Sequence, residues 1–240
     1  MINVEIENVF FSYSQDKSVL KGINISVGQG EIVGLLGSNG SGKTTTLKLL
    51  TGLLFPSGGD IKICGKSLQY DRKENNKLVA YVPDESLLYP NFSALENMNL
   101  FSILWGTESE LAKIRTEKLL KEVGLWEVRN QWVNAYSKGM KQKLSICVAL
   151  LNEPRILIMD EPFNGFDIDG VIWAREMFKS YVSENNRSII FTSHTPEIIE
   201  SMASRVVILK DGKIVQDAPL HEISKSDTLV DVYKAVTSKG

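Results

Sequence analysis

One loop constrains the fold of this chain more than any other feature. It comprises Gly37, Ser38, Asn39, Gly40, Ser41, Gly42, Lys43 and Thr44, which match the pattern GxxxxGK[ST]. The nearly continuous apolar run 31–36 precedes the loop and is typical of a strand buried on both faces. Residues 44–54, which follow it, have the pattern of a helix. A buried strand before the loop and a helix after it are the context that a phosphate-binding loop requires.

The residue types of this loop suit the binding of a nucleoside triphosphate. Glycines leave room for backbone N–H groups to surround phosphate oxygens, and the positive end of the following helix attracts an anion. Lys43 would reach the β- and γ-phosphates, and the hydroxyl of Thr44 would ligate Mg²⁺. We therefore assign the eight loop residues and the following Thr45 to ATP. The alternative is a glycine-rich turn with a solvated lysine.

Two further strands end in polar residues. The apolar run 156–159 is followed by Asp160 and Glu161, and the run 188–191 is followed shortly by His194. Ligands of open α/β sheets bind at the carboxyl ends of the strands. We predict that Asp160 holds Mg²⁺ through water and that Glu161 is the catalytic base that polarises the attacking water. His194 is a candidate sensor of the γ-phosphate. A solvated acidic turn and a structural histidine are the alternatives.

The order of the patterns predicts an α/β fold with a P-loop NTPase core. Strand patterns at 79–82, 156–159, 188–191 and 206–209, with a helical pattern at 168–182, favour a mostly parallel sheet flanked by helices. Residues 4–11 and 19–27 alternate apolar and polar side chains, which indicates an N-terminal antiparallel β part.

A long helical stretch interrupts this alternation. Ser93 and Glu96 have the spacing of a capping box, and residues 111–123 carry apolar side chains three and four positions apart. We predict an inserted α-helical subdomain. The expected organisation is a single domain over 1–225, with a core from 1–84 and 155–225, a helical subdomain over 85–154, and a tail or one short helix over 226–240.

The composition excludes several classes of protein. The formal net charge is −2 over 240 residues, so the chain has no general attraction to nucleic acid or to an anionic membrane. No stretch approaches the ~18 consecutive apolar residues of a membrane helix, and the N-terminus lacks a signal-peptide pattern. Cys64 and Cys147 lie far apart, as expected for a reducing cytosol. We expect a soluble chain that needs a second chain to act across a bilayer.

Together these residues resemble the ABC ATPase family over about residues 4–220. The loop 37–44, the pair Asp160–Glu161 and His194 resemble its Walker A, Walker B and switch-histidine elements. Residues 136–142, Tyr-Ser-Lys-Gly-Met-Lys-Gln, stand where the family has its signature, most often LSGGQ. That element separates the family from other P-loop NTPases. Residues 164–167 resemble the D-loop, and Tyr13 resembles the aromatic residue that stacks on adenine, although a sheet-surface tyrosine is the alternative.

The resemblance implies a mechanism and partners. Two ABC ATPase subunits, identical or sibling, would meet head to tail, with each ATP between the phosphate loop of one and the signature of the other. Ser137 and Gly139 would then bind the γ-phosphate of the other subunit's nucleotide. ATP-driven closure would move a polytopic membrane permease, and the chain would lie on the cytoplasmic face of the membrane.

The sequence departs from the family pattern in three elements. The signature has Lys138 for a glycine and Met140 for glutamine, and the D-loop has Phe166 for leucine. Asp84 stands at the place of the Q-loop glutamine. We predict that Asp84 is a ligand on the metal side, the alternative being simple turn chemistry after Pro83. This form of the signature resembles the bacterial exporter branch that moves antibiotics, peptides or polysaccharides.

Two other functions stay open at this point. One is a soluble ABC protein without a transport role, which co-purification with soluble assembly factors would indicate. The other is a regulatory cassette without catalytic activity, against which the complete set of Lys43, Asp160, Glu161 and His194 argues.

Overall fold

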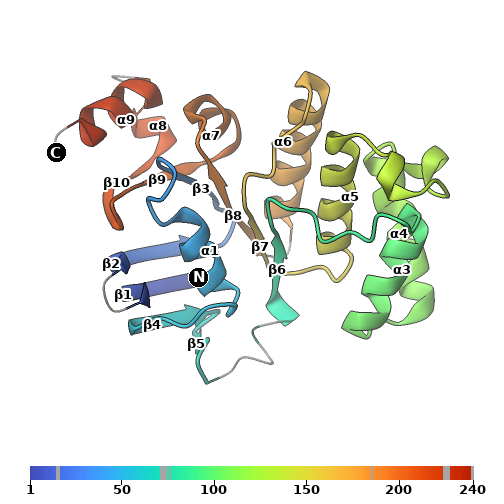
Figure 1. Cartoon of the computed structure of the whole chain (residues 1–240), viewed down its shortest axis with the longest axis horizontal. Coiled ribbons are helices and arrows are strands. Elements are labelled where there is room, and N and C mark those ends of the chain that lie inside the picture. The colour runs from blue at the N-terminus through green and yellow to red at the C-terminus, as the bar shows by residue number, and fades with distance from the viewer. Residues whose placement is uncertain (15–16, 71–74, 76, 185, 224–227, 239–240) are drawn as a thin grey trace.

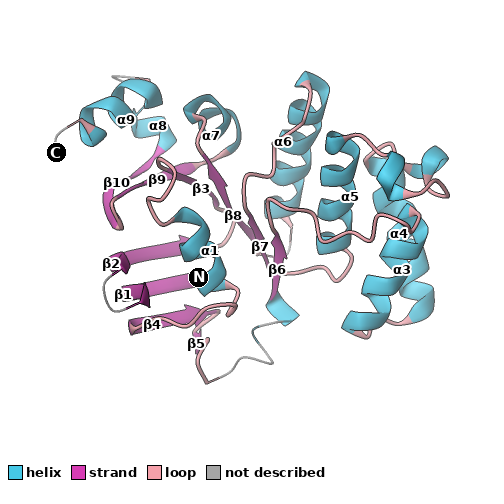
Figure 2. Cartoon of the chain, viewed as in Figure 1, coloured by secondary structure: helices cyan, strands magenta, loops and turns pink. Residues whose placement is uncertain are grey.

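Two β-sheets and a group of helices make up the chain, as Figure 1 shows. This computed structural model describes residues 1–14, 17–70, 75, 77–184, 186–223 and 228–238. Figure 2 shows the strands gathered in one part of the molecule and the helices α3, α4 and α5 in the other. Within the described ranges, no helix has the length and apolar character needed to cross a bilayer.

The elements follow one another along the chain as strands, then helices, then alternating strands and helices. The described strands are β1 (Ile2–Ser14), β2 (Lys17–Gly28), β3 (Ile32–Leu36), β4 (Gly58–Ile63), β5 (Lys66–Ser67), β6 (Val79–Val82), β7 (Ile156–Met159), β8 (Ser188–Ser193), β9 (Arg205–Lys210) and β10 (Lys213–Pro219). The described helices are α1 (Lys43–Leu50), α3 (Ala94–Trp105), α4 (Ser109–Glu122), α5 (Lys138–Leu150), α6 (Ile168–Ser183), α7 (Pro196–Met202), α8 (Leu220–Ile223) and α9 (Leu229–Thr237), with the 3₁₀ turns η1 (Trp126–Val128) and η2 (Val133–Ala135).

The central sheet carries the candidate site. Its strands lie in the order β10-β9-β3-β8-β7-β6, and all neighbours are parallel except β10 and β9. β3, β7 and β8 are buried along their whole length, which explains why their sequences are largely apolar rather than alternating. The predicted fold class, a mostly parallel sheet flanked by helices, is confirmed.

The second sheet is antiparallel and has the strand order β2-β1-β4-β5. Only one of its faces is buried, so its strands alternate: Val4 and Ile6 are buried, whereas Glu7 is exposed. The predicted N-terminal antiparallel β part is therefore present.

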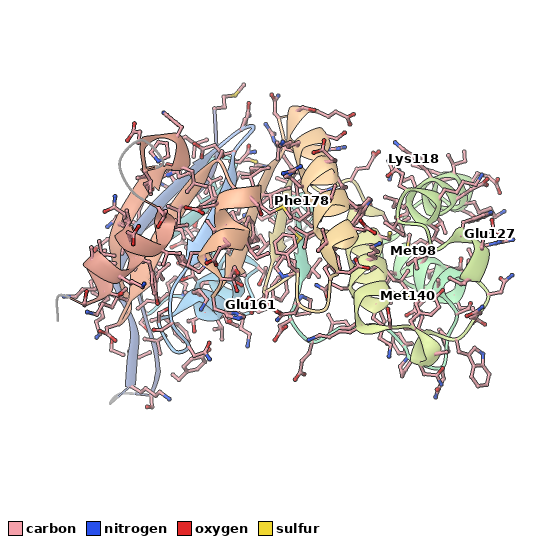
Figure 3. All side chains as sticks on the ribbon, turned by 90° about the horizontal axis from the view of Figure 1, so that it is seen from above. Met98, Lys118, Glu127, Met140, Glu161 and Phe178 are labelled. Carbon is pink, nitrogen blue, oxygen red and sulfur yellow. The ribbon has the colours of Figure 1, made fainter. Side chains whose placement is uncertain are left out.

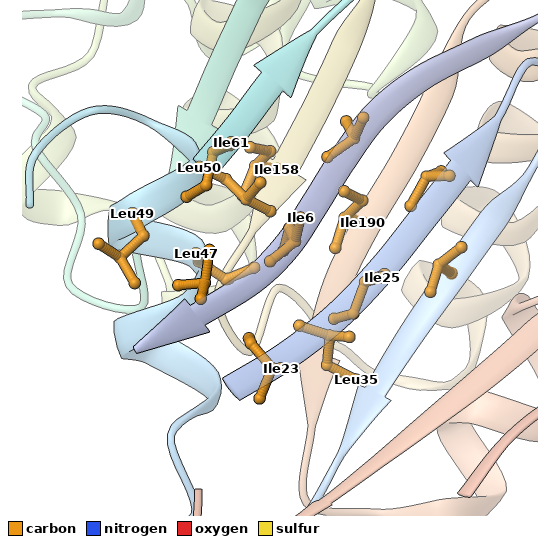
Figure 4. Packing of buried hydrophobic residues seen from close by; sticks show 14 of the residues in the cluster. Ile6, Ile23, Ile25, Leu35, Leu47, Leu49, Leu50, Ile61, Ile158 and Ile190 are labelled. Carbon is orange, nitrogen blue, oxygen red and sulfur yellow. The ribbon is translucent and has the colours of Figure 1, made fainter. Parts of the chain in front are cut away.

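Side chains from the two faces of the central sheet enter different hydrophobic cores. Ile156 and Ile158 of β7 pack with α1 and the antiparallel sheet, whereas Leu157 and Met159 pack with α6 and α7. This division follows from the two-residue period of a strand. Figure 4 shows the first core, in which Ile6, Leu47 and Ile158 come from three separate elements. Each fully buried aliphatic side chain contributes about 1.5–3 kcal/mol, which fixes β3, β7 and β8 against one another.

The helices α3, α4 and α5 enclose a third core of their own, which includes Met98 and Leu144. The capping box at the start of α3 is confirmed: the Ser93 hydroxyl accepts from the Glu96 N–H at 3.2 Å, and the Glu96 carboxylate accepts from the Ser93 N–H at 2.7 Å. Figure 3 labels Met98 within this helical part and Phe178 on α6 of the sheet-containing part. The residue boundaries of the subdomain stay a prediction.

Three local features differ from the sequence expectations. The helix expected at 44–54 ends at Leu50, because the chain turns at Gly52, where φ is +68°. The short helix α7 and the strand β10 were not predicted. Of the two alternatives expected for the C-terminal stretch, a tail or one short helix, the structure has the helix: Leu229–Thr237 forms α9, and the completely buried Leu229 joins the core beside α6 and α7. Residues 226–227 and 239–240 of that prediction lie outside the described part.

Candidate active site

The loop between β3 and α1 needs glycine at two positions for physical reasons. Gly42 has φ +111°, and a Cβ there would lie 2.6 Å from a Leu20 methyl group. A Cβ on Gly37 would lie 2.5 Å from the carbonyl oxygen of Leu209. Larger residues would therefore push the loop off the sheet. No side chain caps the N-terminus of α1 with a hydrogen bond, which suits an anion-binding loop.

Lys43 begins α1 and turns back over this loop. Its ammonium donates to the carbonyl oxygens of Gly37 at 2.8 Å and Ser38 at 3.3 Å. Burial lowers the pKa of Lys43, and the negative charges of Glu161 and Asp160 partly oppose that change. The loop thus holds one buried cation next to the edge where β7 ends.

One hydroxyl of β8 forms hydrogen bonds with both acidic residues that follow β7. Thr192 donates to Asp160 Oδ1 at 2.6 Å and accepts from the Glu161 N–H at 2.9 Å. Asp160 is buried, and Glu161 has a left-handed backbone with φ +46°. Such a conformation is costly for a residue with a Cβ and is concentrated at functional sites. We did not predict a role for Thr192, because its two contacts depend on β8 lying next to β7.

His194 lies directly beside Glu161. Its Nδ1 is 3.0 Å from Glu161 Oε2. An ionised carboxylate can only accept a hydrogen bond, so Nδ1–H donates in this pair. The ring of His194 is more exposed than the Glu161 side chain, with 58% against 17% of the side-chain surface accessible. The imidazole therefore covers the carboxylate from the solvent side.

A cavity of about 320 Å³ lies over these groups. Among its lining residues, Lys43 provides a cation, Thr44 a hydroxyl, and Asp84, Asp160 and Glu161 carboxylates. The remaining lining residues are Tyr13, Lys17, Val19, Asn39, Gly40, Gly42 and Thr45. The sequence reasoning missed Lys17 and Val19, although both follow Tyr13 at the start of the next strand.

Tyr13 stands at the mouth of this cavity. Its hydroxyl is 3.3 Å from the Thr45 hydroxyl, and its ring meets the edge of Phe11 with the ring centroids 4.9 Å apart. Tyr13 is 56% exposed, so part of the residue is accessible to a ligand. This placement suits the predicted contact with adenine.

The signature residues lie outside this cavity. Ser137 caps the N-terminus of α5 and accepts from the Met140 N–H at 3.2 Å. Gly139 packs closely on the turn after β7, so that a Cβ on Gly139 would lie 2.8 Å from the Gly165 carbonyl oxygen. Ser137 and Gly139 are not among the cavity's lining residues, so in this chain alone they are not brought to the phosphate loop. Figure 3 shows Met140 on α5 well apart from Glu161.

Asp84 joins the cavity from the loop after β6. Its Oδ1 accepts from the Asn164 side-chain amide at 3.0 Å. Asp84 and Asp160 line the same cavity, and the role of Asp84 as a ligand on the metal side stays a prediction. Asn164 belongs to the turn after Glu161, and its side chain was not assigned a role from the sequence.

The donor set of the cavity fits Mg²⁺. Thr44, Asp84 and Asp160 offer a hydroxyl and two carboxylates, and Mg²⁺ prefers such hard oxygen ligands. In the described ranges, no group of three His, Cys, Asp or Glu side chains forms a metal cage. Mg²⁺ in phosphate-transfer sites does not need one, because one or two carboxylates, substrate phosphates and waters complete its coordination.

The chain is similar in sequence to known proteins of one family. The family model described as ABC transporter matches residues 20–164. The chain is 36% identical to the bacitracin transport ATP-binding protein BcrA of Bacillus licheniformis, over 89% of this chain and 68% of that protein. It is 33% identical to the Nod factor export ATP-binding protein I of Burkholderia orbicola, over 96% and 75%. It is 34% identical to the linearmycin resistance ATP-binding protein LnrL of Bacillus subtilis, over 88% and 68%.

Solved structures of ABC transporter proteins have a similar fold. An ATP-binding subunit of an ABC transporter superposes with a TM-score of 0.89 and 29% identity, covering 98% of this chain and 99% of that chain. The cbiO1 protein of Clostridium perfringens, part of the cbiONQ transporter complex, gives 0.85 and 25%, with 98% and 95% covered. A bacterial Atm1-family exporter with ATP bound shares the fold, with a TM-score of 0.83 at 19% identity over 98% of this chain and 42% of that chain.

Proposed function

This chain belongs to the ABC transporter family as an ATP-binding protein, and from that membership we propose that it hydrolyses ATP with Mg²⁺ to drive export through a separate membrane protein. The main support for the proposal is that Lys43, Asp160 and Glu161 line a single cavity. His194, which is not a lining residue, contacts the Glu161 carboxylate. A cation for phosphate, a carboxylate for metal and a carboxylate for water are the groups that phosphoryl transfer uses.

The phosphate loop and Tyr13 would bind the nucleotide. The β- and γ-phosphates would lie on the N–H groups of residues 37–45, and Lys43 would exchange its contacts with Gly37 and Ser38 for phosphate oxygens. Adenine would stack on the ring of Tyr13. Val19 and Lys17 line the same cavity and would enclose the remainder of the nucleotide.

Hydrolysis would depend on Glu161. The Glu161 carboxylate would accept a proton from the attacking water, and a general base typically accelerates such a step ~10²–10⁴-fold. His194 would fix the orientation of that carboxylate through Nδ1 and lie close to the γ-phosphate. Thr44, Asp160 and Asp84 would hold Mg²⁺, and the positive charge of the ion would offset the negative charge of the phosphate oxygens.

A second subunit would complete the site. Ser137 and Gly139 lie at the N-terminus of α5, a helix of 13 residues whose positive end attracts anions. Because they do not line the cavity of their own chain, they are available to the nucleotide of another chain. We propose a head-to-tail pair, homodimer or heterodimer, in which Lys138 adds a cation beside each γ-phosphate.

The membrane partner would be a polytopic permease, with this chain on the cytoplasmic face of the membrane. Three similar proteins carry names that refer to bacitracin transport, Nod factor export and linearmycin resistance. These names support export rather than import as the direction.

The test is phosphate release from the purified chain with ATP, in the presence of Mg²⁺ and after its removal with a chelator. We expect release that depends on Mg²⁺ and is lost in Lys43→Ala. Release that persists unchanged in Lys43→Ala would show that the activity comes from a different site or protein.

A further inference from the structure

A hydrogen bond joins two segments that are far apart in the sequence at the edge of the nucleotide cavity. The Asn164 amide Nδ2 donates to Asp84 Oδ1 at 3.0 Å, across 80 positions of sequence. Asp84 lies in the loop after β6, and Asn164 lies in the turn after β7. Asp84 is one of three carboxylates that line the cavity, and this hydrogen bond holds one of its oxygen atoms in place.

The turn that carries Asn164 begins at the proposed catalytic base. The Asn164 N–H donates to the Glu161 carbonyl at 3.2 Å, and the Phe166 N–H donates to the Phe163 carbonyl at 3.0 Å. The buried ring of Phe163 anchors the turn in the core against Phe178 and Phe191. Asn164 therefore projects from a fixed backbone, whereas Asp84 is exposed on a loop.

The turn is also fixed on its other side by the signature. Gly165 has φ +92°, and a Cβ there would lie 2.8 Å from the Lys138 stem. The Gly165 carbonyl oxygen in turn lies close to Gly139. Any side chain at position 165 would separate this turn from the start of α5. The backbone on both sides of Asn164 is thus held by packing.

We propose that Asn164 is a positioning residue for Asp84, which holds the Asp84 carboxylate in the orientation that serves the metal side of the bound nucleotide. The amide offers a donor to one carboxylate oxygen and leaves the second oxygen for the metal ion or one of its waters. A group that donates a hydrogen bond to a metal-ligating carboxylate orients that carboxylate and changes its affinity for the metal ion. Asn164 has this role only in a chain that binds ATP and metal as proposed above.

The test measures metal binding directly, in a Glu161→Gln background so that ATP stays intact. The probe is Mn²⁺, which takes the same hard oxygen ligands as Mg²⁺, and free Mn²⁺ is followed by electron paramagnetic resonance. Asn164→Ala should weaken Mn²⁺ binding to the ATP-loaded protein about three- to tenfold, the usual size of one hydrogen bond. Affinity for ATP in a chelator should stay unchanged. Glu85→Ala, which removes the neighbouring exposed carboxylate outside the cavity lining, is the matched control and should not weaken Mn²⁺ binding.

The double variant separates positioning from a general structural effect. If Asn164 acts through Asp84, then Asn164→Ala should have no further effect on Mn²⁺ affinity once Asp84→Ala is present. The proposal would be overturned if Asn164→Ala weakened Mn²⁺ binding equally with Asp84 present and with Asp84→Ala. It would also be overturned if a lowered thermal unfolding midpoint of Asn164→Ala accounted for the weaker binding. A loss in Asp84→Ala but none in Asn164→Ala would overturn it and leave Asp84 as a ligand. No loss in Asp84→Ala would remove both roles, while Mg²⁺-dependent ATP hydrolysis by the unmodified chain would stand independently.

Discussion

His194 Nδ1 lies 3.0 Å from Glu161 Oε2, and the two side chains come from the ends of adjacent parallel strands, β8 and β7. Glu161 reaches this position with a left-handed backbone, and its N–H is held by Thr192. A strained residue fixed from two sides is expected where a carboxylate must keep one orientation. The histidine–glutamate pair is therefore part of the proposed catalytic apparatus rather than a surface ion pair.

His194→Ala should lower the maximal rate of ATP hydrolysis at least ~10-fold, because the base loses the group that orients it. The affinity for ATP should change little, since His194 is not among the residues that line the cavity. Steady-state kinetics with a separate nucleotide-binding titration distinguish the two effects. A weaker affinity with an unchanged maximal rate would contradict this role.

Lys43→Ala and Ser137→Ala should differ in which step they impair. Lys43 lies in the cavity of its own chain, so its removal should abolish tight nucleotide binding by the monomer. Ser137 lies outside that cavity, so its removal should leave monomer binding nearly intact and weaken ATP-dependent dimer formation and turnover. Fluorescent-nucleotide titration and sedimentation of each variant measure the two properties. Equal loss of monomer affinity in both variants would be incompatible with a head-to-tail pair.

Asp84→Ala should raise the Mg²⁺ concentration needed for half-maximal hydrolysis. Asp84→Gln should restore much of the activity, because its amide carbonyl oxygen can accept from Asn164 or bind a water of the metal ion. Mg²⁺ titrations of the three proteins decide between a ligand and a turn residue. Superimposable titration curves would mean that Asp84 only follows Pro83 in a turn.

The affinity for ATP should decrease as the pH rises through the pKa of Lys43. Burial lowers the pKa of Lys43 below its ordinary value of 10.5, and the protonated ammonium is the form that binds phosphate. Binding strength is therefore complete below this lowered pKa and is lost as the pH rises through it. Titration calorimetry at a series of alkaline pH values up to 10.5, the ordinary pKa of lysine, should show this decrease in the unmodified protein. In a binding-competent Lys43→Arg variant, which stays charged over that range, the decrease should be absent.

The amino-acid sequence was sufficient to predict the groups at the ends of β3, β7 and β8. Parallel strands place their carboxyl ends at one sheet edge, so the motifs and their order were enough to predict that Lys43, Asp160 and His194 come to the same edge. The contacts between these groups could not be predicted in the same way. Thr192 bridges Asp160 and Glu161 because β8 lies next to β7, and that strand order is not visible in a run of apolar residues.

The hydrogen bond between Asp84 and Asn164 could not be predicted from the sequence for a related reason. The two residues belong to separate loops, and their contact depends on how the turn after Glu161 packs against the start of α5. The helix α9 shows the same limit. Its polar and aliphatic residues allowed a tail or a helix, and the burial of Leu229 beside α7 makes it a packed helix.

The central claim is that Glu161 is the base of an ATPase that works as a closed pair, and the measurement that tests it most directly is phosphate release by Glu161→Gln with saturating Mg²⁺ and ATP. Glutamine keeps the size of the side chain and cannot accept the proton from water. We predict release slowed ~10²-fold or more, together with accumulation of an ATP-bound dimer in sedimentation. Release at the rate of the unmodified protein, without such a dimer, would contradict the account.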